Sequence, residues 1–462
     1  MSALARVLLE MGDVVSGSDL QASEATARLA RQGVRIYRGH RPEQIGDAEV
    51  VVVSAAVPED NVELREARAR GLPILGRGQL LAHLMSQRQG VAVAGAHGKT
   101  TTASMVASCL GEAGLDPTVL IGGELNDTGT TSHLGRGRYL VAEVDEFDGT
   151  ISLLEPYLAL VTNVDNDHLD RYGGRMDNLM AAFRRFMEKV RPGGTVVACL
   201  DSPYLVRALA GFRGPLITYS LHDQVGPDGG ADYTARAIEF SPSGTRFRVH
   251  HGKVSLGEVF LRVPGAHNVQ NALGTIAASL YLGVPFGVAA QALAAFRGVQ
   301  RRLQILGEAG GVRVVDDYAH HPTELKATLQ AARIWAGEGR LVCLFQPHRY
   351  TRTRLLHREF GPALALADLV GVMDIYPAAE PVIPGVTGEL VAQAARDQGK
   401  EVPFLKDRDQ ALAWLREQVR PGDLVLVVGA GDVWQLGIRL LEQLRGDPSA
   451  TSTMAATSGT HP

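Results

Sequence analysis

The chain has 462 residues, which is too many for one hydrophobic core and predicts about three domains. Its hydrophobic fraction of 45% and charged fraction of 21% are ordinary for a soluble globular protein, and no apolar run approaches the roughly 18 residues needed to cross a bilayer. A net charge of −4 excludes a general attraction to nucleic acid or anionic lipid, so we expect neither a nucleic-acid nor a membrane partner.

The three cysteines, Cys109, Cys199 and Cys343, lie far apart and show no metal-type spacing. Such wide spacing indicates reduced thiols with roles as small buried hydrophobes. The opening residues lack the basic and apolar regions of a secretion signal, so we expect a cytoplasmic protein.

The first block, residues 1–85, alternates helical and strand patterns. Helices are predicted to end at Gly12 and Gly33. Strands are predicted over 13–20, 34–37 and 49–57, and the last of these (EVVVVSAAV) is apolar enough to predict a fully buried strand. This alternation predicts a parallel, doubly wound sheet, that is, a Rossmann-like domain. The block opens on a helix, whereas a nucleotide-binding unit of this type opens on a strand and a glycine turn.

The second block, residues 86–298, begins with a strand, a glycine loop and a helix. Further buried strands are predicted over 138–146 and 157–165. Around 215–262 polar and apolar residues alternate and are broken by Gly and Pro, which predicts antiparallel hairpins. Helices over 268–283 and 287–298 close the block.

A third block, residues 299–446, has buried strand patterns separated by helical segments and is predicted to be a second Rossmann-like α/β unit. The predicted strands are 312–317, 340–346, 369–375 and 423–431. Residues 447–462 contain almost no bulky apolar residue, so we predict a disordered tail there.

The most informative segment is GVAVAGAHGKTTTAS, where a strand leads into a glycine loop and a helix. Glycines let loop amides turn towards an anion, and the helix start adds partial positive charge. Lys99 supplies a full charge for the β- and γ-phosphates of ATP, and a Thr100 or Thr101 hydroxyl suits Mg²⁺. The generic spacing requires Gly or Ala where this chain has Val93, so the match is partial, and a structural turn with an incidental lysine is the alternative. The predicted ATP loop comprises Gly95, Ala96, His97, Gly98, Lys99, Thr100 and Thr101.

Acidic residues follow the next two buried strands, at the sheet edge where ligands of open α/β sheets bind. They are Glu143, Asp145, Glu146 and Asp148 after one strand, and Asp165, Asp167 and Asp170, with His168, after the other. Glu143 and His168 would complement the loop threonine in a Mg²⁺ site. Because histidine is an unusual ligand for a hard cation, His168 stays open between a metal contact and a loop hydrogen bond. Asp145 and Asp148 are more typical of turn caps than of ligands.

Five segments together resemble one family. AHGKTTTASM, VTNVDNDHLDRYG and PGAHNVQNA resemble the phosphate loop, metal segment and adenine-contact segment of the Mur ligases. VVDDYAHHPTEL and LFQPHRYTRTR resemble C-terminal signatures of the branch that adds L-alanine. The resemblance covers about residues 1–445 and implies three domains: a UDP-substrate-binding domain, a central ATPase domain and a C-terminal amino-acid-binding domain.

The resemblance implies a ligase of bacterial cell-wall synthesis that uses ATP to join L-alanine to UDP-N-acetylmuramate through an acyl phosphate. Such chemistry needs charge neutralisation around the transferring phosphoryl group. By resemblance, Lys99 binds phosphate, Thr100 and Glu143 bind Mg²⁺, and His168 binds a second Mg²⁺. Arg302, at the hinge into the third block, matches an arginine that reaches ATP, although spacing alone does not separate it from Arg301.

Two further groups of residues are assigned by resemblance. His267, Asn268 and Asn271 contact the adenine, although asparagines near a helix start are otherwise more typical of caps. Arginines suit a carboxylate or phosphate, although HRYTRTR on its own is more typical of a solvated basic loop. The residues expected to face the acyl and amino-acid end of the site are Tyr318, His320, Arg349 and Arg352. Because they lie in another domain than the phosphate loop, we expect the site to be completed by domain closure.

Two departures from the family pattern matter. Several relatives carry a modified lysine where this chain has Phe183, which agrees with the L-alanine-adding branch. The strand and glycine turn that hold the UDP pyrophosphate come, in the family, just before the segment matching residues 1–5. We expect a start assigned too late at an internal methionine rather than a truncated protein. His40 matches a remaining UDP-side contact.

Other functions stay open at this point. A recycling ligase attaches a tripeptide to the same nucleotide but usually lacks the arginine run that includes Arg349 and Arg352. A folate polyglutamylating ligase shares the ATP loop but lacks a UDP domain. The chain could also be a non-catalytic ATP-binding remnant, because the N-terminal glycine turn is absent. We expect a monomer or a homodimer.

Overall fold

The structure is a computed structural model that describes residues 1–123, 132–146, 149–167, 169–222, 225–226 and 229–446. His168, Asp148 and the predicted tail, 447–462, lie outside these ranges. The chain divides into two compact units. The first comprises Met1–Ala237, Phe247–Phe260 and Val269–Phe296, and the second comprises Ile238–Arg246, Leu261–Asn268 and Arg297–Pro462.

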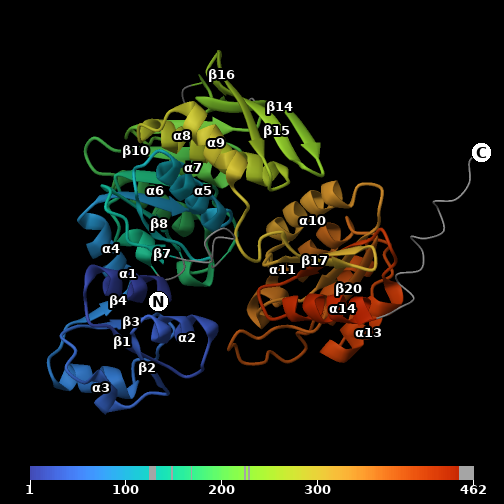
Figure 1. Cartoon of the computed structure of the whole chain (residues 1–462), viewed down its shortest axis with the longest axis horizontal. Coiled ribbons are helices and arrows are strands. Elements are labelled where there is room, and N and C mark those ends of the chain that lie inside the picture. The colour runs from blue at the N-terminus through green and yellow to red at the C-terminus, as the bar shows by residue number, and fades with distance from the viewer. Residues whose placement is uncertain (124–131, 147–148, 168, 223–224, 227–228, 447–462) are drawn as a thin grey trace, which may run out of the picture. The chain divides into compact units, whose positions relative to one another are not determined.

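The N-terminal segment of the first unit contains two small parallel sheets and their helices (Figure 1). β1 pairs with β2 and β3 pairs with β4. The helix α1 ends before Gly12, which has a φ of 100° and provides the predicted left-handed stop. The elements are α1 (Ser2–Met11), β1 (Ser16–Asp19), α2 (Glu24–Arg31), β2 (Arg35–Arg38), η1 (Pro42–Ile45), β3 (Val51–Val53), α3 (Val62–Ala69), β4 (Ile74–Gly76) and α4 (Arg77–Ser86).

Parallel pairing in this segment is confirmed, but the described strands form two separate sheets and not one. The prediction of a fully buried strand over 49–57 is wrong. Only Val51–Val53 is a strand, and all three of its residues are half-buried. β3 pairs only with β4 in a two-stranded sheet, so one of its edges has no neighbouring strand.

A ten-stranded sheet follows, in the order β16-β15-β14-β11-β10-β9-β5-β8-β6-β7. Its central strands β11, β10, β9, β5, β8 and β6 are parallel. β5, β8 and β9 are the strands predicted at the phosphate loop and acidic segments. The strands are β5 (Gln89–Ala94), β6 (Thr118–Leu120), β7 (Ser132–His133), β8 (Tyr139–Glu143), β9 (Leu158–Val161), β10 (Thr195–Cys199), β11 (Leu216–Ser220), β14 (Tyr233–Ser241), β15 (Gly244–His251) and β16 (Val254–Leu261).

The antiparallel prediction for 215–262 is correct only in part. Two-residue connections join β14 to β15 and β15 to β16, as expected of hairpins. The short strands β12 (Val225–Gly226) and β13 (Gly229–Gly230) are antiparallel. By contrast, β11 pairs in parallel with both β10 and β14, so it continues the central sheet. The short apolar run of β11 is compatible with both parallel and antiparallel pairing, so the sequence does not distinguish them.

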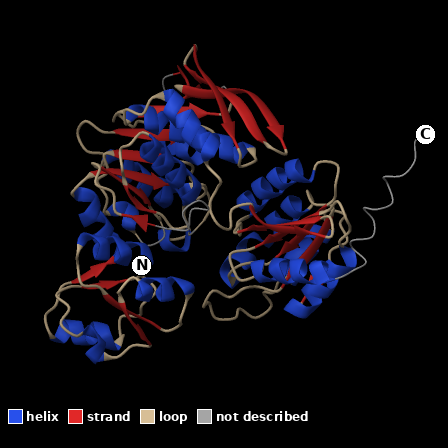
Figure 2. Ribbon diagram, viewed as in Figure 1, coloured by secondary structure: helices blue, strands red, loops and turns tan. Residues whose placement is uncertain are grey.

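Helices lie beside this sheet in Figure 2. The predicted helices over 268–283 and 287–298 are confirmed as α8 and α9. α5 packs against α9 and against β5 and β8. These elements are α5 (Lys99–Glu112), η2 (Thr150–Ser152), η3 (Leu169–Tyr172), α6 (Met176–Glu188), α7 (Pro203–Leu209), α8 (Ala266–Tyr281) and α9 (Phe286–Ala295).

The second unit contains a six-stranded sheet in the order β17-β18-β22-β19-β20-β21, parallel except for β17. One buried cluster packs α10, α11 and α12 against the sheet and another packs α13 and α14, which confirms the doubly wound prediction. The elements are β17 (Gln304–Ala309), β18 (Val312–Asp317), α10 (Pro322–Ala336), β19 (Leu341–Phe345), α11 (Tyr350–Leu364), β20 (Leu369–Met373), α12 (Glu389–Arg396), β21 (Phe404–Leu405), α13 (Arg408–Gln418), β22 (Leu424–Val428) and α14 (Trp434–Gly446).

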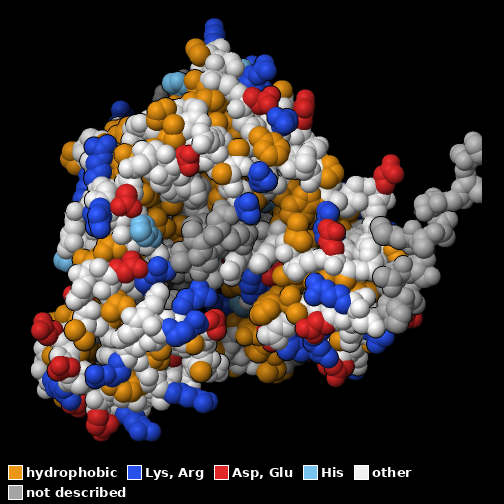
Figure 3. Space-filling model, in the orientation of Figure 1, with side chains coloured by type: hydrophobic (Ala, Val, Ile, Leu, Met, Phe, Trp, Pro, Cys, Tyr) orange, Lys and Arg blue, Asp and Glu red, His pale blue; other side chains and the backbone are white. Residues whose placement is uncertain are grey.

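The three cysteines are buried as free thiols in α5, β10 and β19. Burial raises the pKa of Cys109 and of Cys343 to about 12, and it also raises that of Cys199. Basic and acidic side chains are interspersed on the face seen in Figure 3. Within the described ranges, no helix combines the length and apolarity required to traverse a membrane.

Candidate active site

The phosphate loop lies between β5 and α5, as predicted. Gly95 has a φ of 138° and Gly98 a φ of 80°, a region that L side chains rarely adopt. A Cβ on Gly98 would lie 2.6 Å from Asn271 Oδ1, and one on Gly95 would overlap the Thr162 hydroxyl. Both positions therefore require glycine, for backbone conformation and for space. Asn271 of α8, predicted to contact adenine, lies directly beside this loop.

Lys99 is folded back over the loop. Its ammonium donates to the carbonyls of Gly95 at 2.7 Å and Ala96 at 3.3 Å, and to Glu146 Oε2 at 3.1 Å. Asp145 Oδ1 lies 3.5 Å away. Burial by itself lowers the pKa of Lys99, but the carboxylates of Glu146, Asp145 and Glu143 outweigh it, so the pKa is raised. The lysine therefore keeps its charge at neutral pH.

Thr100 and Glu143 form an oxygen pair at the start of α5. The Thr100 hydroxyl lies 2.9 Å from both Glu143 carboxylate oxygens, and the Gly122 amide donates to Oε2 at 2.9 Å. Burial and then Asp145 raise the pKa of Glu143, against the opposing effects of Lys99, Gly122 and Thr100. A hydroxyl and a carboxylate at the edge of a phosphate loop are the ligand types that Mg²⁺ takes beside phosphate oxygens and water. Thr101, one residue on, is half-buried.

The acidic segment after β8 has a second role that sequence reasoning missed. The sequence favours a turn cap for Asp145 and assigns no function to Glu146, yet both carboxylates face Lys99. Glu146 is only 3% exposed, and its carboxylate lies 3.1 Å from the Lys99 ammonium. The Tyr172 hydroxyl fixes this segment by donating to the Glu146 carbonyl at 2.7 Å.

Residues after β9 hold the other side of the loop. The His97 amide donates to Asn163 Oδ1 at 2.8 Å, and the His97 carbonyl accepts from the Thr162 hydroxyl at 2.6 Å. The His97 ring Nε2 lies 2.9 Å from Asp165 Oδ2. Thr162 and Asn163 were not predicted, although they follow a strand that pairs directly with β5. His168 is outside the described residues, so its metal role stays a prediction.

His267 and Asn268 lie at the start of α8. Asn268 Nδ2 donates to the Pro264 carbonyl at 2.7 Å, which ties the first turn of α8 to the residues before it and is not the N-cap bond, in which a side-chain oxygen accepts from a backbone amide. Burial, and then the charge of Arg302, lower the pKa of His267 to about 4, against the effect of Glu324. His267 is therefore neutral at physiological pH, and its adenine role stays a prediction.

Arg301 and Arg302 differ in what they bind. Arg301 Nε lies 3.0 Å from Asp316 Oδ2, and its Nη2 donates to the Gly429 carbonyl at 2.7 Å. Both guanidinium groups lie over the Tyr318 ring, at 4.9 and 5.5 Å from its centroid. Arg302 Nη1 lies 3.6 Å from Glu324 Oε1. Arg301 is thus tied to the sheet, and the ATP-reaching role of Arg302 stays a prediction.

The predicted residues of the third block gather at the carboxyl ends of parallel strands. Tyr318 and His320 follow β18, and their rings meet edge to face at 5.5 Å. His348, after β19, lies 5.5 Å from the His320 ring and stacks on Tyr376, which follows β20. His348 and Tyr376 had not been predicted, although strand order would have placed them here.

The arginines of the HRYTRTR segment lie at the start of α11. Arg352 is 7% exposed, and its Nη1 lies 3.4 Å from His348 Nδ1. Arg349 has a φ of 71°, and its amide donates to the Tyr376 carbonyl at 2.9 Å. A buried arginine contradicts the alternative of a fully solvated basic loop.

His40 lies in the N-terminal segment, after β2. Its Nδ1 is 3.0 Å from the Ser18 hydroxyl and 3.5 Å from Glu63 Oε1. The same hydroxyl donates to Glu63 Oε2 at 2.7 Å. Ser18 and Glu63 had not been predicted, and their sequence separation from His40 gave no signal.

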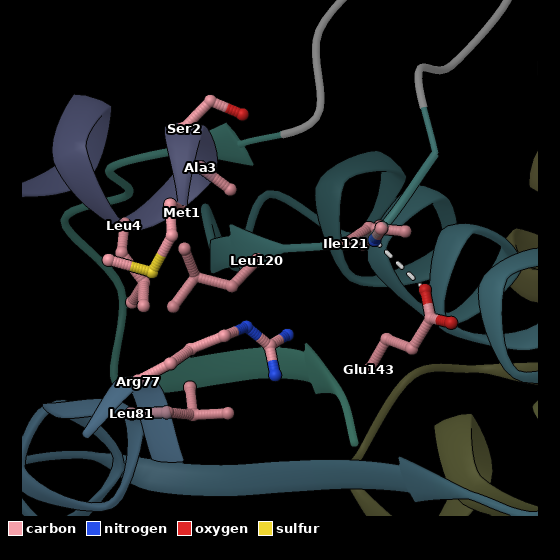
Figure 4. Close-up of a pocket in the computed structure, with 10 residues that line it drawn as sticks. Met1, Ser2, Ala3, Leu4, Arg77, Leu81, Leu120, Ile121 and Glu143 are labelled. Atoms are coloured by element: carbon pink, nitrogen blue, oxygen red, sulfur yellow. Dashed lines mark hydrogen bonds between the residues drawn. The ribbon is translucent and has the colours of Figure 1, made fainter. Parts of the chain in front are cut away.

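A cavity of about 110 Å³ lies between the N-terminal segment and Glu143 (Figure 4). It is bounded by the start of α1, the start of α4, the end of β6 and the end of β8. Its lining residues are Met1, Ser2, Ala3, Leu4, Arg77, Leu81, Leu120, Ile121, Gly122 and Glu143.

Three models of the Mur ligases match the chain in succession. Residues 1–89 match the Mur ligase family catalytic domain, residues 93–279 the Mur ligase middle domain, and residues 301–431 the Mur ligase glutamate ligase domain. This succession agrees with the three-domain architecture predicted from the sequence.

Whole-chain relatives agree with these matches. UDP-N-acetylmuramate–L-alanine ligases of Pelotomaculum thermopropionicum and of Geobacter sp. strain M21 are 48% and 47% identical, each over 96% of this chain and 95% of the relative. The structure of the Thermotoga maritima UDP-N-acetylmuramate–alanine ligase has a TM-score of 0.82, with 30% identity over 96% of both chains. A murein peptide ligase from Psychrobacter arcticus has a TM-score of 0.69, with 26% identity over 97% of both chains. The phosphate loop and these matches lead to one conclusion: the chain belongs to the Mur ligase family.

Proposed function

We propose that this chain uses ATP to form an amide bond between L-alanine and UDP-N-acetylmuramate in peptidoglycan precursor synthesis. The observation that carries this proposal is the 48% identity, over 96% of the chain, to a ligase of that name. The murein peptide ligase of Psychrobacter arcticus has a lower identity and TM-score than the Thermotoga maritima L-alanine ligase, which makes tripeptide attachment the second candidate.

In the proposed reaction the substrate carboxylate attacks the γ-phosphorus of ATP, and ADP leaves. The amine of L-alanine then attacks the acyl carbon, inorganic phosphate leaves, and the nitrogen loses its extra proton. Most of the work for the protein is positioning and charge neutralisation. Lys99, Thr100 and the amides of residues 95–101 are suited to hold the phosphates.

The residues around Thr100 and Glu143 fit a Mg²⁺ ion by donor type, since both offer hard oxygen atoms and Glu143 is buried beside Lys99. When bound there, Mg²⁺ would neutralise charge on the phosphate oxygens. Glu143 must be ionised to bind it, and the nearby Lys99 charge favours that form. His168 is proposed for a second ion on the basis of the family resemblance.

The second unit supplies the groups proposed for the amino acid. Arg349 and Arg352 have guanidinium groups that suit the carboxylate of L-alanine. The contact with His348 restricts the position of Arg352. The hydrogen bond to the Tyr376 carbonyl restricts the backbone of Arg349. Arg302 is proposed for ATP, and closure of the domains stays a prediction.

Phosphate release tests this function. With ATP, Mg²⁺, UDP-N-acetylmuramate and L-alanine all present, we expect stoichiometric release of phosphate, and omission of any one component stops it. Turnover with the cell-wall tripeptide L-alanyl-γ-D-glutamyl-meso-diaminopimelate in place of L-alanine, and none with L-alanine, would show that the runner-up is correct. ATP binding without turnover on either acceptor would indicate a non-catalytic ATP-binding protein.

A further inference from the structure

Lys99, the lysine proposed to bind phosphate, is bound by groups of its own chain. An ammonium group has three N–H donors, and that of Lys99 has three acceptors close by. They are the Gly95 carbonyl at 2.7 Å, Glu146 Oε2 at 3.1 Å and the Ala96 carbonyl at 3.3 Å. A phosphate oxygen can therefore bind this ammonium only by replacing one of the three acceptors.

The two acidic residues that face Lys99 differ in their exposure to water. The Glu146 side chain is 3% exposed, whereas that of Asp145 is 43% exposed. Water screens the charge of an exposed group much more than that of a buried one. The Tyr172 hydroxyl also donates to the Glu146 carbonyl at 2.7 Å and so restricts the backbone of Glu146. Of the two carboxylates, that of Glu146 therefore acts on the lysine with little screening.

The surroundings of Lys99 contain more carboxylates than ammonium groups. The Glu143 carboxylate acts on the Lys99 charge together with those of Asp145 and Glu146. One ammonium does not neutralise three carboxylates, so an anion that approaches the loop meets net repulsion. The oxygens of Glu143 lie 2.9 Å from the Thr100 hydroxyl, and this oxygen pair suits Mg²⁺. A divalent cation held there would offset the excess negative charge.

We propose that Glu146 makes nucleotide binding conditional on a divalent cation, so that the loop selects Mg²⁺-bound ATP over metal-free ATP. Glu146 holds Lys99 against the loop carbonyls and repels a phosphate that arrives without a cation. Once Mg²⁺ offsets the negative charge, Lys99 exchanges Glu146 for a phosphate oxygen. This inference rests on the proposed function in taking ATP as the nucleotide, and it does not depend on which amino acid or peptide the protein adds.

Binding of the non-hydrolysable analogue β,γ-imido-ATP tests the inference without turnover. Each protein is titrated with the analogue in a calorimeter, once in excess Mg²⁺ and once in EDTA. We expect Glu146→Gln to strengthen binding of the metal-free analogue about tenfold or more, because the neutral amide does not repel phosphate. Binding of the Mg²⁺-bound analogue should change less than about threefold, because the cation already offsets the charge. Glu146→Asp keeps the charge and should keep most of the preference for the Mg²⁺-bound form.

Matched controls separate the effect of burial from the effect of charge. Asp145→Asn removes the same charge from the neighbouring residue, but Asp145 is exposed, so binding of the metal-free analogue should strengthen less than about threefold. Glu188→Gln removes a charge from a surface ion pair with Arg184 and should leave both affinities unchanged. Glu143→Gln should weaken binding of the Mg²⁺-bound analogue, because Glu143 is a proposed Mg²⁺ ligand.

A thermal melt verifies that each variant is folded. Glu146→Ala should shift the preference in the same direction and replaces Glu146→Gln if the latter does not fold. Unchanged binding of the metal-free analogue would overturn the proposal, as would an equal gain for both forms. Weaker binding of both forms would also overturn it, because Glu146 would then assist phosphate binding instead of opposing it.

The proposed function and the role of Glu146 fail in different experiments. A wild-type protein that binds the analogue but releases no phosphate with L-alanine would contradict the proposed function. Its preference for the Mg²⁺-bound analogue, and the loss of that preference in Glu146→Gln, would still support the role of Glu146.

Discussion

The charge of Lys99 is stabilised by the groups around it. Its ammonium is enclosed by two loop carbonyls and by the carboxylates of Glu146 and Asp145. A phosphate that binds the loop must compete with these groups for the same donor. The Lys99 ammonium is positioned to bind an anion at the loop. Its attraction for that anion is reduced by the neighbouring carboxylates of Asp145 and Glu146.

Replacing Lys99 by alanine should lower kcat/KM by about 100-fold or more, the usual cost of losing one charge-stabilising donor in a transition state. Phosphate release under saturating UDP-N-acetylmuramate and L-alanine is the measurement. A variant with near-normal turnover would remove Lys99 from its proposed role. Lys189→Ala is a control, because Lys189 donates to the Ser152 carbonyl at the protein surface.

His267 gives a prediction about pH. Its pKa of about 4 in the folded protein is below the usual value of 6.5. As the pH falls from about 6.5 to 4, the unfolded chain binds a proton at His267 and the folded protein does not, so stability falls. Lowering the pKa from 6.5 to about 4 corresponds to a full effect of about 3 kcal/mol.

Urea unfolding at pH 7 and at pH 4.5, for wild type and His267→Gln, measures this effect. The variant should lose less stability than the wild type over the same interval. The difference between the two proteins is required because Asp316, whose pKa burial raises to about 6, acts in the opposite direction. Identical losses in both proteins would contradict the neutral, buried state of His267.

At the scale of elements, the phosphate loop depends on close packing between Gly98 and α8. Gly98→Ala should reduce ATP affinity at least tenfold, because the new methyl would lie 2.6 Å from Asn271 Oδ1 and displace the loop or the helix. Gly114→Ala is a matched control. Gly114 also has a left-handed φ, of 70°, but no atom lies within 4 Å of the added carbon. Both variants should lose about 1 kcal/mol of stability from backbone strain, and only Gly98→Ala should lose ATP binding in a titration.

The elements that sequence reasoning predicted well have strong local patterns. β5, the loop and α5 follow from an apolar run, two glycines and a helix-forming stretch, and α8 and α9 from long apolar periodicity. The half-buried strand β3 and the parallel pairing of β11 were not predicted, because burial and pairing depend on which strands come alongside. Local sequence contains no information about that neighbour.

The candidate site shows the same division. Gly95, Lys99, Thr100 and Glu143 could be predicted, since motif and strand ends place them together. Glu146 and Ser18 could not, because their roles depend on partners 47 and 22 residues away in sequence.

At the scale of the whole molecule, the two compact units have separate cores. Leu426 of β22 is fully buried in the second unit. Leu426→Ala should cost about 2–5 kcal/mol through the cavity that it leaves. In scanning calorimetry without ligands we expect this variant to lower one unfolding transition and leave the other in place, with ATP affinity of the first unit retained. A single transition that shifts as a whole would show that the units unfold together.

Because the three cysteines are buried, the rate at which each thiol reacts measures how often the structure around it opens. Each thiol lies in a different core element, two in the first unit and one in the second. Since an alkylating reagent reacts with an exposed thiolate, and burial raises all three pKa values, modification requires that the surrounding structure opens first. The rates at which Cys109, Cys199 and Cys343 are labelled therefore measure, without any engineered probe, how often the helix after the phosphate loop and one central strand of each large sheet become accessible.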